Sequence, residues 1–297
     1  MGPTESVTGF GVGPVRARRV GAWARKGHGM TAGAQAAPAG TLEEAGSNPA
    51  LNPQAFARAM AETPVGERTG MTAAGAYAKA FALLVLLVLA AAFGWSQVTS
   101  VSVGGQTFAL APGWTWIVFL LAFIVGIVGA VSPKTAPVTG PLYALGQGAL
   151  LGVVSHFYNA EWDGIVLQAV LATLAVFLAT WLLYTTGVIK VTPGFARFVM
   201  IAMLALIVAW LAAWVLSLFG VRFTSLFSPT PLGIAIAALV VVLGALNLPL
   251  DFEFIRSASA AGAPKRLEWY AAFGLMLSII WIYTSILRLL ALLRSTK

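Results

Sequence analysis

Four charged residues near the end of the chain stand within or beside blocks that are otherwise apolar. They fall in the stretch 246–294 and are Asp251, Glu253, Glu268 and Arg288. Charge at bilayer depth is costly, so residues of this kind commonly mark ion pathways, proton relays or gates. A carboxylate in such a place gains or loses a proton according to its surroundings. The chemistry that this stretch could perform is therefore that of a proton-sensitive gate.

Asp251 and Glu253 would close an apolar block that we expect to end near residue 250. Two residues apart on a helix, they point to different faces and so form no local carboxylate pair. Two interpretations remain open. Both side chains could be solvated in the cytoplasmic headgroup zone, which is the simpler explanation for Glu253. Alternatively, Asp251 lies inside the bundle beneath a helix break at Pro249 and acts as the gate residue.

Glu268 and Arg288 have explanations that require no function. Glu268 would lie in the first turn of the last helix, where a negative charge is favoured by the helix dipole. Arg288 lies near the far end of that helix and could extend its guanidinium to the outer interface. A salt bridge inside the bundle is the alternative for Arg288.

Two polar positions in the third apolar block are further candidates. His156 is followed by Glu161 and Asp163, a set that could bind a cation weakly. The aromatic residues close to it favour an interfacial belt instead. Gln147 lies in mid-block between glycines, so it could hydrogen-bond across closely packed helices.

Several classes of chemistry are excluded by what the sequence lacks. It has no cysteine and two histidines, so thiol chemistry, disulfides and a cluster of imidazole ligands are ruled out within one chain. The zinc motif HExxH, the nucleophile elbow GxSxG and the Walker lysine are also missing. We expect no enzyme activity and no cofactor.

The composition is that of an integral membrane protein. Of 297 residues, 59% are hydrophobic and 9% are charged, against about 25% charged residues in soluble domains. The net charge of +8 fits cytoplasmic loops held by the positive-inside rule, not nucleic-acid binding. The expected partner is the lipid bilayer.

Seven apolar blocks are each close to the roughly 20 helical residues that cross a bilayer. They lie at about 77–97, 114–132, 139–158, 164–186, 197–219, 231–250 and 267–293. Glycine and proline interrupt the third and sixth blocks, so either could be partly re-entrant. The fold class that follows is an all-α seven-transmembrane-helix bundle over 71–297.

The remaining segment, 1–70, is rich in Gly, Ala, Pro, Ser and Thr and has no sustained periodicity. We expect it to be a disordered cytoplasmic segment, with 47–59 as a short surface helix. With seven spans, fourteen of the 18 Lys and Arg residues fall on the N-terminal side of the membrane. This bias predicts a multi-pass protein of the plasma membrane with a cytoplasmic N-terminus and an outside C-terminus.

Two long motifs resemble a known family. They are SPKTAPVTGPLYALGQGALLGVVSHFYN at 132–159 and the tail LNLPLDFEFI…GAPKRLEWYAAFGLMLSIIWIYTSILRLL at 246–290. Both resemble the Bax inhibitor-1 family, also called the transmembrane Bax inhibitor motif or YccA-like family, in its bacterial, actinobacterial-type branch. The resemblance covers about 47–293.

The resemblance implies a bundle of seven helices with the last one in the centre. It also implies a pH-sensitive leak of Ca²⁺ or other cations, gated by two aspartates that share a proton. Some bacterial members instead regulate a membrane-bound AAA protease, which is the alternative function here. In that case a non-conducting protein would act through its cytoplasmic N-terminal segment.

This chain departs from the family pattern at two positions. Asp251 matches the acid of the sixth helix, but the position of the second acid falls at Met276. Relatives often have Glu where this chain has Gln147. A single acid would titrate simply and not as a coupled pair.

Overall fold

Apolar helices make up most of the part of the chain that the computed structural model describes. This part comprises residues 70–103, 106–220 and 228–296, together with Arg58 and Ala61. In chain order its elements are α3 (Ala73–Ser96), β1 (Thr99–Val103), β2 (Gln106–Leu110), α4 (Thr115–Val131), the 3-10 helix η2 (Pro133–Thr135), α5 (Ala136–Glu161), α6 (Ile165–Thr185), α7 (Pro193–Leu218), α9 (Pro231–Ala260) and α10 (Leu267–Arg294). The predicted disorder of 1–70 and the predicted helix at 47–59 lie outside the described residues, apart from positions 58, 61 and 70.

The helices correspond one for one to the predicted apolar blocks. Six of them are long and apolar enough to cross a membrane, whereas α4 is a shorter apolar helix of 17 residues. Three begin at a threonine whose hydroxyl accepts the backbone N–H three residues on: Thr72, Thr192 and Thr230. Such caps satisfy a backbone N–H that the first turn leaves unpaired.

The predicted end of the sixth block and the predicted break at Pro249 are both wrong. Helix α9 continues through Pro249 to Ala260, so neither Asp251 nor Glu253 lies at its end. The apolar block stops near 250 because polar side chains begin there, but the helix continues because Phe252, Phe254 and others are buried in the core. The third block, α5, is likewise one continuous helix, so the prediction of re-entrant segments is wrong for both.

A two-stranded antiparallel hairpin, which the sequence analysis does not predict, connects α3 to α4. Strand β1 pairs with β2 from Thr99 opposite Leu110 to Val103 opposite Gln106. A signal for it exists in the sequence, because Gly104 and Gly105 separate a run rich in Val and Thr from a short run that contains Thr107 and Phe108. These runs are too short and too polar to stand out beside the apolar blocks.

Glycines allow α3 and α5 to pack with their backbones in close contact. A Cβ added at Gly152 would lie 1.9 Å from the Ala91 carbonyl oxygen, and one at Gly148 would lie 2.3 Å from that of Leu87. A Cβ at Gly94 of α3 would meet the Ala149 carbonyl oxygen at 2.0 Å. Small residues at a helix interface permit this approach in membranes.

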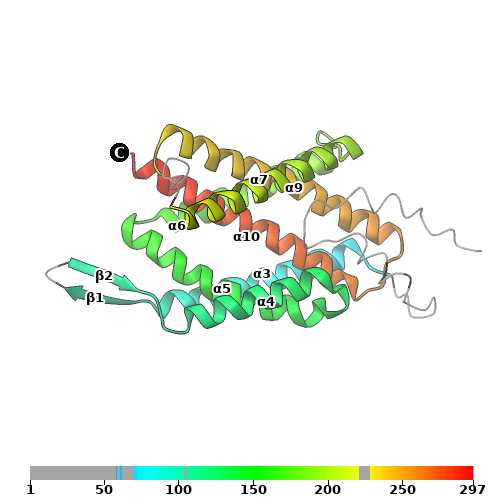
Figure 1. The fold of residues 1–297 in the computed structure, drawn as a ribbon. Coiled ribbons are helices and arrows are strands. Elements are labelled where there is room, and N and C mark those ends of the chain that lie inside the picture. The colour runs from blue at the N-terminus through cyan, green and yellow to red at the C-terminus, as the bar shows by residue number, and fades with distance from the viewer. Residues whose placement is uncertain (1–57, 59–60, 62–69, 104–105, 221–227, 297) are drawn as a thin grey trace, which may run out of the picture. The chain divides into compact units, whose positions relative to one another are not determined.

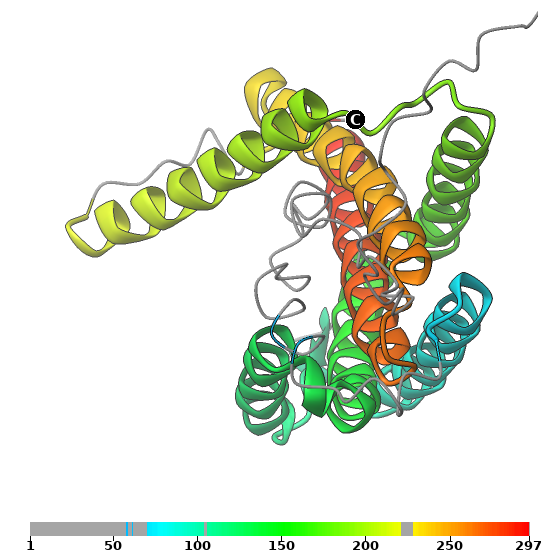
Figure 2. The ribbon, with the colours of Figure 1, turned by 90° about the vertical axis from the view of Figure 1, so that its right-hand side faces the viewer.

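Helix α10 packs against α3, α4, α5, α6 and α9 (Figure 1). Figure 2 shows α9 beside it and α7 projecting away from this pair. Helix α7 buries few of its own side chains, namely Ala196, Val199 and Met203. Helix α7 therefore leaves much of its surface exposed.

A single methyl group added at the contact between α3 and α5 should weaken their packing. We expect Gly152→Ala to lower the stability of the purified protein by about 1–3 kcal/mol, the usual cost of overpacking, because its Cβ would clash with backbone. The measurement is thermal unfolding in detergent. Gly113→Ala is the matched control, since a Cβ there meets nothing within 4 Å. Equal melting temperatures for the two variants would contradict the close contact.

Candidate functional site

A buried polar face of α9 forms the centre of the candidate site. Asp251 is 1% exposed and lies about 14 Å before the end of α9, at a rise of 1.5 Å per residue. Asn247 is one turn earlier, and residues four apart share a helix face. The Asn247 side-chain amide donates a hydrogen bond of 3.0 Å to the Ser278 hydroxyl of α10. Polar groups thus join α9 and α10 inside the bundle.

This polar face leads to a cavity of about 510 Å³. Residues of α4, α5, α7, α9 and α10 line it, most of them apolar. Its uncharged polar lining includes Tyr143, Gln147, Asn247, Ser278, Thr284 and Ser285. Asp251 is not part of the lining but lies one turn from Asn247, toward the loop between α9 and α10. Gln147, predicted to hydrogen-bond across helices, lies at the wall of this cavity.

The surroundings of Asp251 are aromatic as well as polar. The ring of its neighbour Phe252 meets that of Tyr77 of α3 edge-on, with centroids 6.4 Å apart. Met276, at the position of the second acid in the resembled family, is fully buried in α10. Among the described acidic residues, Glu268 is the other one that is buried, and it is bound elsewhere.

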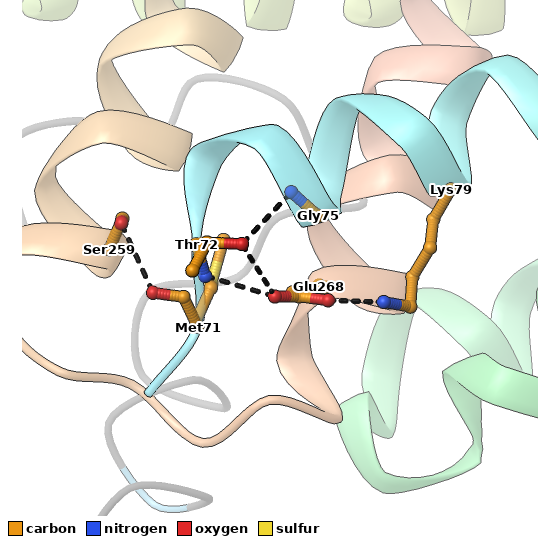
Figure 3. Close-up of polar contacts among 6 residues, drawn as sticks. All are labelled: Met71, Thr72, Gly75, Lys79, Ser259 and Glu268. Carbon is orange, nitrogen blue, oxygen red and sulfur yellow. Dashed lines mark hydrogen bonds and ion pairs between the residues drawn. The ribbon is translucent and has the colours of Figure 1, made fainter. Parts of the chain in front are cut away.

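Glu268 holds the beginning of α3 against the beginning of α10 (Figure 3). Its carboxylate accepts hydrogen bonds from the Thr72 N–H at 2.9 Å and the Thr72 hydroxyl at 3.2 Å. Its second oxygen forms an ion pair with Lys79, which is in the second turn of α3. The sequence analysis places Glu268 in the first turn of its own helix, and it lies there, but its carboxylate binds α3.

The residue before the N-cap of α3, Met71, is held at the same place by hydrogen bonds. The Met71 N–H donates to the Ala263 carbonyl at 2.6 Å, and the Ser259 hydroxyl donates to the Met71 carbonyl at 3.1 Å. Gly75 leaves room for Glu268, because a Cβ at that position would lie 2.4 Å from the carboxylate and would displace it. We name this set of contacts, made by 71–79 with 259–268, the Glu268 clamp.

The other predicted site residues lie apart from Asp251 and from one another. Glu253 is half-buried and accepts hydrogen bonds from the Tyr184 hydroxyl at 2.7 Å and from Arg256 at 2.5 and 2.9 Å. It is therefore not simply solvated, and it faces α6, away from the position of Asp251.

His156 and Arg288 lie toward the end of the bundle opposite the Glu268 clamp. The His156 ring meets Trp95 edge-on at 4.9 Å, and Glu161 and Asp163 behind it are exposed. No group of three or more His, Asp or Glu side chains that could hold a metal ion occurs among the described residues. Arg288 is half-buried at the wall of a second cavity.

Sequence reasoning missed the partners of the buried charges. Lys79 is one of the fourteen basic residues assigned to the N-terminal side of the membrane, yet it lies inside α3 and pairs with Glu268. The available signal was a lysine within an apolar block, because such a residue needs a partner at membrane depth. Asn247 and Ser278 were missed as well, although both are polar residues inside predicted spans.

Removing the lysine of the Glu268 clamp should destabilise the protein strongly. We expect Lys79→Met to cost roughly 3–5 kcal/mol, because it leaves the buried Glu268 carboxylate without its cation. The double variant Lys79→Met, Glu268→Gln should recover part of this loss. Thermal unfolding in detergent measures both, and Lys190→Met, at an exposed lysine, is the control. A Lys79→Met protein as stable as Lys190→Met would contradict the pairing.

Comparison with known proteins gives one match. The model of the family described as Bax inhibitor 1 like matches residues 32–295, which is nearly the whole chain. No curated protein and no solved structure matches the chain significantly.

Proposed function

The chain belongs to the Bax inhibitor 1 like family, and we propose that it is a pH-sensitive cation leak, permeable to Ca²⁺, in the plasma membrane. In this proposal all seven apolar helices cross the bilayer around α10, the shorter α4 included. The N-terminus is cytoplasmic and the C-terminus is outside. Asp251 is the gate residue.

The observation that supports the proposal is a carboxylate buried inside a helix long and apolar enough to cross a membrane, one turn from a largely apolar cavity with several polar groups in its wall. In this proposal, a cation that leaves the cavity toward the α9–α10 loop passes Asn247 and Ser278 and then Asp251. Hydroxyl and amide oxygens suit cations such as Ca²⁺ as ligands. A deprotonated Asp251 would attract a cation into the narrow part of this path, and a protonated one would not.

The proton dependence expected of this site is simple. The second acid of the resembled family is replaced by the buried Met276, and the other buried acid, Glu268, is about 17 residues and a loop away in the Glu268 clamp. Since one carboxyl group titrates alone, the leak should follow a single protonation step without the two-step behaviour of a coupled pair.

Replacing the gate carboxylate tests the proposal directly. We expect Asp251→Asn to change both the basal Ca²⁺ flux into liposomes and its dependence on pH between about 5 and 8, the range in which perturbed carboxylates commonly titrate. The amide keeps the size of the side chain but cannot carry its charge. Glu161→Gln, at an exposed acid, should leave the flux unchanged. Flux through Asp251→Asn equal to that of the unmodified protein would remove Asp251 from the gate.

The Glu268 clamp favours a second candidate function, that of a non-conducting regulator of a membrane-bound AAA protease. Residues 70 and 71, where the continuously described chain begins, are hydrogen-bonded to the α9–α10 loop, which also carries Lys265 and Arg266. A partner that binds the N-terminal segment could therefore contact this loop as well.

Deletion of residues 1–69 separates the two functions. If the protein is a leak, the truncated chain should conduct Ca²⁺ in liposomes as the full chain does, because 70–296 retains the clamp and the cavity. If it is a tail-dependent regulator, neither chain should conduct, and the truncated chain should lose its effect on proteolysis in the membrane. Full conduction together with loss of protease regulation would assign both functions to the chain.

A further inference from the structure

A second cavity adjoins the first and extends it along α10. Its volume is about 530 Å³. The two cavities share Trp210 of α7 and Thr284 and Ser285 of α10 in their walls. The two cavities therefore adjoin along α7 and α10, and we name them together the α7 groove.

The α7 groove opens toward the side of the bundle. Its rim on α4 is formed by Phe119 and Phe123, which are 53% and 58% exposed, and its rim on α7 by Trp210, which is 42% exposed. These apolar rims are continuous with the surface that faces lipid when the helices span a membrane. A lipid chain can therefore enter from the side without crossing a polar barrier.

The groove has one charged end. Among the described residues that line either cavity, Arg288 is the charged one. It lies about 9 Å before the end of α10, beside Tyr158, which is itself close to the end of α5 and stacks near Trp162. Tyrosine, tryptophan and long basic side chains gather at the headgroup level of a bilayer.

The length of the groove fits one leaflet. From Arg288 to Leu277, the lining residue of α10 furthest from it, the helix rises about 16 Å. Half of a hydrocarbon core of about 30 Å is nearly the same depth. An acyl chain whose headgroup lies at Arg288 would thus reach the inner end of the groove near the middle of the membrane.

We propose that the α7 groove binds an anionic phospholipid of the bilayer. Its phosphate lies on the Arg288 guanidinium, which binds phosphate oxygens through two parallel hydrogen bonds. One acyl chain lies along α10 past Trp210. This binding is independent of the proposed cation leak, since it needs neither Asp251 nor any ion flux.

Lipid binding can be measured on the full-length protein in detergent by native mass spectrometry. We expect one phosphatidylglycerol per chain, retained at concentrations at which phosphatidylcholine with the same acyl chains is lost. Arg288→Gln should weaken phosphatidylglycerol binding about ten-fold, because it removes a charge-assisted contact. Arg294→Gln is the control: Arg294 lies outside both cavities and binds the Asp163 carbonyl and Gln168.

A second pair of variants tests the acyl-chain site without touching Arg288. Ala213 lines the groove, whereas its neighbour Ala212 is exposed and lines neither cavity. Ala213→Trp should fill the groove and abolish retention of the lipid, and Ala212→Trp should not. Equal retention by these two variants, or equal binding of the two lipids, would overturn the proposal. So would a dimer that Ala213→Trp dissociates, because the groove would then be an interface between two copies.

Discussion

The ion pair between Glu268 and Lys79 connects the beginning of the first described membrane helix to the beginning of the last. Both charges lie within apolar helices, where neither would be stable without the other. Thr72 adds two hydrogen bonds to the same carboxylate. Because α10 also packs on α4, α5, α6 and α9, the position of α3 relative to most of the bundle depends on this contact and on the glycines that bring α3 to α5.

The candidate site depends on the same arrangement. Asp251 is buried in a turn of α9 whose next residue, Phe252, contacts the Tyr77 ring of α3 and the Phe177 and Tyr184 rings of α6. The polar groups that follow, Asn247 and Ser278, belong to helices that hold each other by their hydrogen bond. A carboxylate is therefore kept inside the bundle, with a cavity on one side of it and the α9–α10 loop on the other.

Much of the fold follows from the sequence, because a bilayer imposes one simple length on its helices. All seven apolar blocks are helices, and the alternation of faces correctly separates Asp251 from Glu253. The end of α9 could not be found in this way, because burial of Phe252 and Phe254 continues the helix beyond the apolar block. The partner of Glu268 could not be found either, since Lys79 is 189 residues away along the chain and no local pattern connects the two. The hairpin was missed because its strands are short.

The sequence separation of this ion pair has a consequence for biosynthesis. Helix α3 is made first, and Lys79 enters the membrane before Glu268 exists. At about 5–20 residues per second, the ribosome needs roughly 10–40 s to add the intervening residues. During that time the lysine must keep its ammonium group at the membrane surface or be shielded by the insertion machinery. Until Glu268 is inserted, α3 therefore lacks the partner that its lysine has in the folded bundle.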